Sequence, residues 1–164
     1  MATSAHALRS RVRRLLHDPH PAPRRRTLTQ VLDRFSAVES TWEVFLFGGL
    51  PRDLAVAGPS YLPRDVDMVI AGATIDQIAH IVPGRDMRHN RFGGINFVID
   101  NWSVDVWPID RTWAFLKHWD KDISMANLPK TTFLNVEAIA VELRTTRGRA
   151  RRVYEHHFFE GVRN

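Results

Sequence analysis

The chain has 164 residues and a net charge of +5, a length that fits one domain with a sizeable hydrophobic core. It contains no cysteine, which excludes disulfides and thiolate metal sites. It has no apolar run of about 18 residues that could span a membrane and no signal-peptide core, so we expect a cytoplasmic protein without membrane association.

The N-terminal part predicts two amphipathic helices. Apolar residues recur at helical spacing over residues 4–17, and a proline-rich stretch at 19–23 ends that pattern. A second apolar stripe runs over residues 27–38. We therefore expect a basic N-terminal helix and linker over residues 1–26, followed by one domain over residues 27–164.

A glycine pair follows the next apolar run. Residues 43–47 predict a strand, Gly48 and Gly49 come directly after it, and Pro51 opens a short helix predicted over 52–57. A glycine turn ahead of a helix N-terminus lets backbone N–H groups approach phosphate oxygens. Arg52 would add a charge-assisted contact, so the segment predicts a site for a triphosphate.

Two aspartates one residue apart, Asp65 and Asp67, belong to the next predicted strand, at 66–70. Successive side chains of a strand alternate between its faces, so both carboxylates project from one face and the apolar side chains between them from the other. Such close like charges need cations or hydrogen-bond donors that compensate them. Mg²⁺ fits because it prefers oxygen ligands, and a pair of such ions would need a further carboxylate.

The third carboxylate is expected at Asp105. The preceding sequence alternates as a hairpin with its turn at 100–101 and its return strand at 103–107. In that strand Asp105 projects away from the core-facing valines on either side of it. Asp100 is explained by the turn and Asp110 lies past a proline, so neither is preferred.

The remaining elements predict an α/β (α+β) fold with a mixed or antiparallel sheet packed on helices on one face. Helices are expected over 74–81 and 111–119. A second hairpin is expected from 136–143 and 151–154, over a turn at 147–148. Trp107 shares the strand face of Asp105, and it is the tryptophan that we would test for contact with a base.

These motifs together resemble a known family. The run GGLPRDLAVAG followed by RDVDMVI resembles the GGxVRDxLLGR and DxD motifs in the catalytic head of CCA-adding enzymes and bacterial poly(A) polymerases, within the polymerase-beta nucleotidyltransferase superfamily. FGGINFVIDNWSVDVWPI is similar to the strand pair that ends in the family's third carboxylate, which the resemblance places on Asp105. KTTFLNVEAIA loosely matches RRDFTINA and carries its asparagine onto Asn135, and VYEHHFFEGV is similar to DPFGGxxDL.

The similarity spans roughly residues 42–162, with departures. Pro51 replaces an aliphatic residue, and Lys-Thr-Thr at 130–132 replaces most of an Arg-Arg-Asp triplet. The neck, body and tail that select the base and hold tRNA in this family have no counterpart in the matched region. The resemblance therefore does not imply CCA addition itself.

The resemblance implies a nucleotidyltransferase that uses Mg²⁺ or Mn²⁺ to transfer NMP from an NTP such as ATP to a hydroxyl of RNA or protein, with release of pyrophosphate. The small format also implies a partner chain or a homo-oligomer. Asp65, Asp67 and Asp105 would be catalytic and hold the metal. The nucleotide would be bound by Gly48, Gly49, Arg52 and Asn135.

Two other functions stay open. The fold could serve as a non-catalytic binding or antitoxin module, with Asp65 and Asp67 in a surface network with arginines and Asn135 as an ordinary turn residue. Alternatively, the basic stretches at 9–26 and 144–152 could belong to a general RNA-binding protein, since a pI near 10.4 attracts polyanions.

Overall fold

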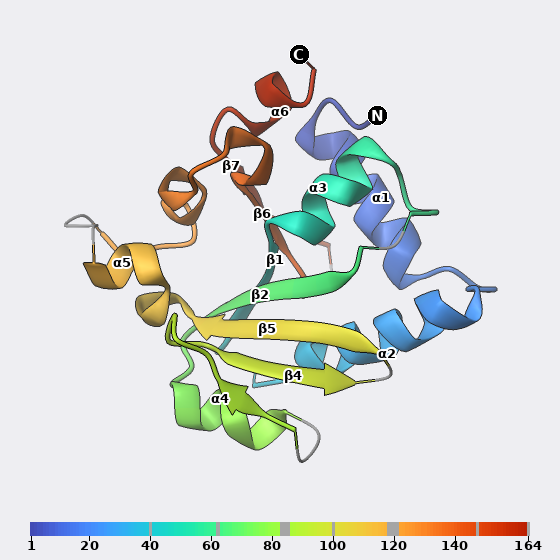
Figure 1. The fold of residues 1–164 in the computed structure, drawn as a ribbon. Coiled ribbons are helices and arrows are strands. Elements are labelled where there is room, and N and C mark those ends of the chain that lie inside the picture. The colour runs from blue at the N-terminus through green and yellow to red at the C-terminus, as the bar shows by residue number, and fades with distance from the viewer. Residues whose placement is uncertain are drawn as a thin grey trace.

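A computed structural model describes residues 1–39, 41–61, 63–82, 86–99, 101–117, 122–146 and 148–163. Its strands form one sheet in the order β3-β4-β5-β2-β1-β6-β7 (Figure 1). Strands β2 and β5 run parallel, and the other neighbours are antiparallel. The predicted α/β fold with a mixed sheet is confirmed.

The strands are β1 Glu43–Phe47, β2 Asp65–Ala71, β3 Arg88–His89, β4 Ile95–Ile99, β5 Trp102–Pro108, β6 Ile139–Glu142 and β7 Val153–Glu155. The α-helices are α1 Ala5–Leu16, α2 Pro23–Ser36, α3 Gly49–Val56, α4 Ile75–Ile81, α5 Trp113–Lys117 and α6 Phe158–Gly161. Short 3₁₀ helices are η1 Ile109–Arg111, η2 Leu128–Thr131 and η3 Asn135–Glu137.

The N-terminal helix is part of the domain. Leu8, Val12 and Leu15 of α1 are buried in the main core, and α1 packs against α3. Helix α2 begins at Pro23. Proline suits the first turn of a helix, because the N–H group that it lacks would have no partner within the helix there. The expected boundary at residues 26 and 27 thus falls inside α2, and residues 1–26 do not form a separate unit.

The sheet separates two hydrophobic clusters. Val66, Met68 and Ile70 of β2 face the larger cluster, which includes the buried sides of α1, α2, α3 and α4. On the opposite face, Phe45 and Val69 pack in a smaller cluster below α5 and η2. The alternation of apolar and acidic side chains between the two faces of β2 is therefore confirmed. The helices, which were expected on one face of the sheet, cover parts of both faces.

The first four expected elements after α2 have the predicted type. Strand β1 matches residues 43–47, β2 extends one residue beyond the prediction at each end, and α4 lies within 74–81. Helix α3 begins at Gly49, three residues before the expected start. Gly48 therefore forms the turn ahead of the helix, and Gly49 is the first residue of the helix.

The later elements differ more from the sequence pattern. Strands β4 and β5 form the predicted hairpin, but Asp100 lies outside the described residues. Helix α5 is shorter than 111–119, and Trp119 lies outside the described residues. The last hairpin begins at Ile139 and not at residue 136, because residues 135–137 form η3. Arg147, in the expected turn of this hairpin, lies outside the described residues.

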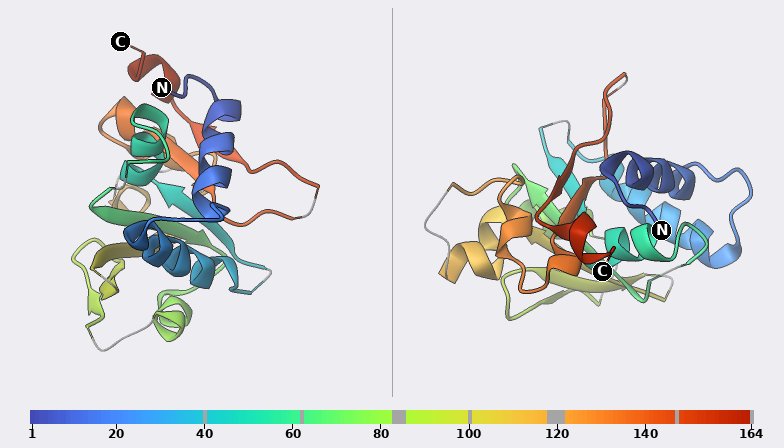
Figure 2. Two further views of the ribbon diagram at one scale, coloured as in Figure 1. Left: turned by 90° about the vertical axis from the view of Figure 1, so that its right-hand side faces the viewer. Right: turned by 90° about the horizontal axis from the view of Figure 1, so that it is seen from above.

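The two termini lie near each other at one end of the molecule (Figure 1 and Figure 2). Among the helices of the described residues, none combines the length and hydrophobicity needed to cross a membrane. The cytoplasmic location stays a prediction.

Candidate active site

A row of paired residues crosses the sheet at the site. Asp67 on β2 is directly opposite Asp105 on β5 and Phe47 on β1, and Asp105 is in turn opposite Asn96 on β4. Side chains of directly paired residues project from the same face of a sheet. The row therefore places Asp67 and Asp105 side by side, with Asp65 two residues earlier on the same face of β2.

The glycine turn approaches these carboxylates from above β2. Gly48 has φ of +61°, a conformation that favours glycine, and its N–H donates to Ile139 O at 3.3 Å. A Cβ atom at Gly48 would lie 3.7 Å from Asp67 Oδ2, and one at Gly49 would lie 3.9 Å from Asp65 Oδ1. The turn and both aspartates thus face one space.

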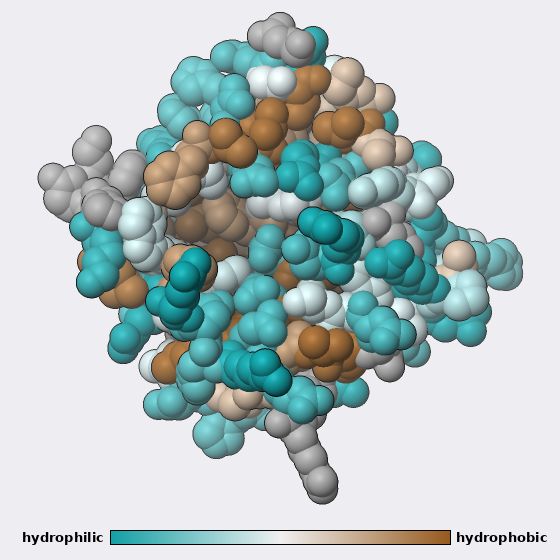
Figure 3. Space-filling view, viewed as in Figure 1, coloured by the Kyte–Doolittle hydropathy of each residue, from teal (hydrophilic) through white to brown (hydrophobic). Residues whose placement is uncertain are grey.

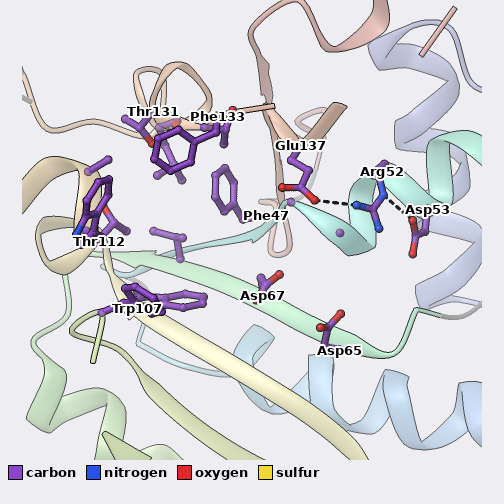
Figure 4. Close-up of a pocket in the computed structure, with 18 of the residues that line it drawn as sticks. Phe47, Arg52, Asp53, Asp65, Asp67, Trp107, Thr112, Thr131, Phe133 and Glu137 are labelled. Atoms are coloured by element: carbon purple, nitrogen blue, oxygen red, sulfur yellow. Dashed lines mark hydrogen bonds and ion pairs between the residues drawn. The ribbon is translucent and has the colours of Figure 1, made fainter. Parts of the chain in front are cut away.

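Arg52 lies at the edge of this space, held by two carboxylates. Its Nε donates to Asp53 Oδ1 at 2.8 Å and its Nη1 donates to Glu137 Oε1 at 2.9 Å (Figure 4). The hydrogen bond to Asp53 raises the pKa of Arg52, and the negative charges of Asp53, Glu137 and Asp65 act in the same direction. Glu137, from η3, is a site residue that the sequence motifs did not identify.

Asp67 has the most perturbed acidity of the site. Burial raises the pKa of Asp67 to about 7, and the charges of Asp65, Asp105 and Glu137 contribute, partly opposed by Arg52. Without a cation, this carboxyl group is therefore only partly ionised at neutral pH, because ionising it would add charge to an already negative and partly desolvated cluster.

Asp105 is held by two amides. Asn90 Nδ2 donates to Asp105 Oδ1 at 3.1 Å, and Asn96 Nδ2 donates to Asp105 Oδ2 at 3.0 Å. Each oxygen of an ionised carboxylate has two lone pairs, so these bonds fix the orientation of Asp105 and leave acceptor capacity. Neither asparagine was identified from the sequence, although Asn96 follows from the register of the predicted hairpin.

A pocket of about 830 Å³ opens beside the two aspartates of β2. Its lining contains Gly48, Gly49, Arg52, Asp65 and Asp67, but Asp105 and Asn135 are not part of it. Figure 3 shows hydrophobic residues around a recess on this face, close to the α5 region. The further lining side chains include Phe47, Asp53, Tyr61, Arg64, Val69, Phe92, Trp107, Thr112, Trp113, Leu128, Thr131, Thr132, Phe133 and Glu137.

Asn135 is not brought to the other site residues. It is exposed, and a Cβ atom at Gly161 of α6 would lie 2.7 Å from its Nδ2 atom. The carboxamide therefore lies against α6. Of the loosely matching segment, Thr131, Thr132, Phe133 and Glu137 reach the pocket instead.

Asp65 and Asp67 form a donor set that suits a divalent cation. Among the described residues, no three His, Cys, Asp or Glu side chains are grouped as metal ligands. The two aspartates nevertheless supply hard oxygen ligands on one face, and Mg²⁺ commonly binds through one or two carboxylates, waters and substrate phosphates. Burial is the main cause of the raised Asp67 pKa, and a cation would offset the repulsion from neighbouring carboxylates that adds to it, so Asp65 and Asp67 fit such an ion.

Comparison with known proteins defines the fold. No protein-family model matches the sequence, and no curated protein matches it. The structure is similar to the Thermotoga maritima CCA-adding enzyme complexed with tRNA, with 19% identity and a TM-score of 0.60. It is also similar to CCA-adding enzyme structures with CTP, at 19% and 0.60, and with ATP, at 20% and 0.59.

The chain has the fold of the nucleotidyltransferase head of CCA-adding enzymes. Each of these matches covers 93% of the chain, but the chain spans only 34% or 35% of the length of those enzymes. The family resemblance predicted from the sequence motifs is confirmed at the level of the fold.

Proposed function

We propose that the protein is a nucleotidyltransferase that uses Mg²⁺ or Mn²⁺ to transfer NMP from an NTP to a hydroxyl group of an RNA 3′ end or a protein side chain. The observation that carries this proposal is the placement of Asp67 opposite Asp105, with Asp65 on the same face, beside a glycine turn in this fold. The similar solved enzymes are complexed with CTP, ATP and tRNA, which supports a nucleotide substrate and an RNA acceptor.

The phosphates of the NTP would lie along the start of α3. The backbone N–H of Gly49 and the guanidinium of Arg52 would bind its β- and γ-phosphates. Gly48, whose own N–H donates to Ile139 O, would let the backbone approach the phosphates closely. Arg52 would exchange its bond to Glu137 for a phosphate oxygen. Asp65 and Asp67 would hold the metal ion, which when bound neutralises charge on the phosphates and on the leaving pyrophosphate.

In the reaction, the acceptor oxygen forms a bond to the α-phosphorus. The bond from that phosphorus to the oxygen bridging it to the β-phosphate breaks, and pyrophosphate leaves with the bonding electrons. The proton of the acceptor hydroxyl passes to Asp105 and then to solvent. The hydrogen bonds from Asn90 and Asn96 orient the Asp105 carboxylate for this step. Such catalysis rests on positioning and electrostatic stabilisation.

The hypothesis of a general basic RNA-binding protein is weakened by the contacts of its arginines. In the N-terminal stretch, Arg9 Nε donates to Arg151 O at 2.7 Å and Arg11 Nη1 to Leu54 O at 2.8 Å. In the C-terminal stretch, Arg149 and Arg152 pair with the buried Glu142. Part of the basic excess therefore stabilises the fold instead of forming a free polyanion-binding surface.

A non-catalytic module explains less than the proposed enzyme. A half-buried carboxylate beside two or three others lowers the stability of the fold until a cation compensates the charges. A module that only binds a partner does not need such an arrangement. The half-buried position of Asp67 thus favours metal-dependent chemistry over simple retention of the fold.

The test uses the purified chain, each α-labelled NTP, Mg²⁺ or Mn²⁺, and total RNA with a cell lysate. Wild type is compared with Asp65→Asn/Asp67→Asn and with Asp110→Asn, an exposed aspartate on η1 as control. We expect label to move to RNA or protein with wild type and the control, and a loss on the order of a hundredfold or more with the double variant. If no label moves with any nucleotide although the chain is folded, the protein is not an enzyme on its own.

A further inference from the structure

Exposed aromatic side chains concentrate at the pocket. Among the described residues, Tyr61, Phe92, Trp113 and Phe133 are the large aromatic side chains that are exposed, and all four line it. Phe133 is 88% exposed. The exposed large hydrophobic side chains elsewhere in the described part are aliphatic. An aromatic surface left open to water at a single concave site is typical of a binding site for a flat ligand.

The aromatic residues are unevenly placed about the carboxylates. In Figure 4, Trp107, Phe47 and Phe133 lie on one side of Asp67, and Arg52 lies on the other. The pocket thus has a charged end at α3 and an aromatic end towards α5. A nucleoside triphosphate has the same polarity, with charge at one end and an aromatic base at the other.

Trp107 forms one wall of the aromatic end. It follows Asp105 by two residues on β5 and pairs with Val69, so it lies on the same face as the carboxylates. A Cβ atom at Gly94 on the neighbouring chain segment would lie 2.4 Å from two atoms of the Trp107 ring. The indole therefore packs directly against the Gly94 backbone. Any side chain at residue 94 would overlap with the ring, so this position of Trp107 requires glycine.

Trp113 and Phe133 form the other wall. Their ring centroids lie 5.9 Å apart with planes tilted by 44°. Trp113 comes from α5, whereas Phe133 comes from the segment between η2 and η3. Thr112, Thr131 and Thr132 add hydroxyl groups beside these rings.

We propose that this aromatic end is the subsite for the nucleobase, which stacks between Trp107 and the Trp113–Phe133 pair while the triphosphate lies at Gly48, Gly49 and Arg52. The inference rests on the proposed function, since it takes an NTP as the ligand. Stacking tolerates every base because each has a π-face, so all four NTPs bind within about a factor of ten and the larger purines bind best.

The test measures binding in Mg²⁺ without an acceptor, by calorimetry. One ligand is an ATP analogue with a methylene group between the α- and β-phosphates, which cannot be cleaved there. The other is inorganic tripolyphosphate, which has the charge but no base. We expect Trp107→Ala to weaken the ATP analogue about five- to a hundredfold, with tripolyphosphate binding unchanged, and Trp107→Phe to retain most of the affinity.

Two further variants test whether a loss of affinity comes from the subsite or from a folding defect. Phe133→Ala removes a side chain that is 88% exposed, so the fold is expected to be unaffected and the ATP analogue to bind more weakly. Val98→Ala removes a side chain of β4 that is 56% exposed and does not line the pocket, so it should leave the binding of both ligands unchanged. If the ATP analogue binds to Phe133→Ala and to Trp107→Ala as tightly as to wild type, the base lies elsewhere and the inference is wrong.

The outcomes separate this inference from the proposed function. Equal affinity of wild type for the ATP analogue and tripolyphosphate would leave the phosphate site intact and overturn the base subsite. Failure of both ligands to bind would instead contradict the proposed nucleotide function, and the inference with it. A preference of more than a hundredfold for one base would overturn recognition by stacking alone, because stacking does not distinguish the edges of the bases.

Discussion

Asp67 and Asp105 are directly opposite each other on β2 and β5, the pair of neighbouring strands that runs parallel in the described sheet. Like charges directly opposite each other destabilise a sheet. Here burial is the main cause that raises the pKa of Asp67 to about 7, and the charges of Asp65 and Asp105 add to it. The pairing is therefore unfavourable for the metal-free protein at neutral pH and favourable once a cation is bound.

This relationship predicts a pH-dependent stability for the metal-free protein. The pKa of Asp67 is about 7 when folded and about 4 when unfolded, so between these values the folded state binds more protons. The contribution of Asp67 to the free energy of unfolding is thus complete below about pH 4 and is lost as the pH rises towards 7. The loss is on the order of 2 to 4 kcal/mol.

Denaturant unfolding in EDTA at pH 5 and pH 8 measures this loss, with Asp67→Asn and Asp110→Asn compared with wild type. We expect Asp67→Asn to gain stability relative to wild type at pH 8 but not at pH 5, because asparagine does not titrate. Added Mg²⁺ should stabilise wild type at pH 8 and leave Asp67→Asn unchanged. Parallel pH profiles for wild type and Asp67→Asn would contradict the raised pKa.

The hydrogen bond from Asn96 predicts a positioning role. Asn96→Ala removes one of the two amide donors to Asp105, so we expect kcat to fall about tenfold while KM for the NTP stays unchanged. Ser103→Ala is the matched control, because Asn96 Nδ2 also donates to Ser103 Oγ at 3.2 Å and that bond does not involve the carboxylate. An equal loss in both variants would indicate a general effect on the β4–β5 hairpin.

The acidic strand residues could be predicted from the sequence because their placement depends on local alternation. Asp65 and Asp67 are two residues apart in one strand, and the hairpin pattern alone turns Asp105 to the same side as Trp107. The direct pairing of Asp67 with Asp105 was not derivable in this way, since it depends on which strands become neighbours in the sheet.

The site residues that could not be predicted from the sequence belong to segments whose position is set by tertiary packing. Glu137 reaches the site because η3 interrupts the expected strand, and no periodicity indicates that break. Asn135 matched the family motif, but η3 directs it to α6 instead. The aromatic end of the pocket likewise combines β5, α5 and the segment after η2, which are distant in the sequence.

We expect substitution of the two glycines at the start of α3 to have different effects, one on phosphate binding and the other on stability. Gly49→Ala should leave the fold intact, because the φ of Gly49 is not positive and a Cβ atom there would lie 3.7 Å from Arg52 Nη2 and 3.9 Å from Asp65 Oδ1. Alanine is also the better helix former, by about 1 kcal/mol. Its methyl group would occupy the space for a phosphate, so we expect tripolyphosphate affinity to fall about tenfold or more, measured by calorimetry.

Gly48→Ala serves as the contrasting variant. Gly48 has φ of +61° and ψ of −114°, a backbone conformation that side chains rarely adopt and that costs on the order of 1–3 kcal/mol, so we expect a lower free energy of unfolding in denaturant titrations. Reduced stability for Gly49→Ala, with normal phosphate binding, would mean that this glycine is required by the backbone and not by a ligand.

The ion pair between Arg52 and Glu137 predicts a variant that binds phosphate more tightly. The two side chains are 33% and 42% exposed, so breaking their 2.9 Å contact should cost less than about 1 kcal/mol of stability. Glu137→Gln weakens this contact and leaves one side of the guanidinium available to the incoming triphosphate. We therefore expect tripolyphosphate to bind a few-fold more tightly, with the largest gain at low salt. Because the gain acts through Arg52, it should vanish in an Arg52→Gln background, where the single change Arg52→Gln weakens binding. A gain that persists there would show that Glu137 acts on the phosphates by its charge alone.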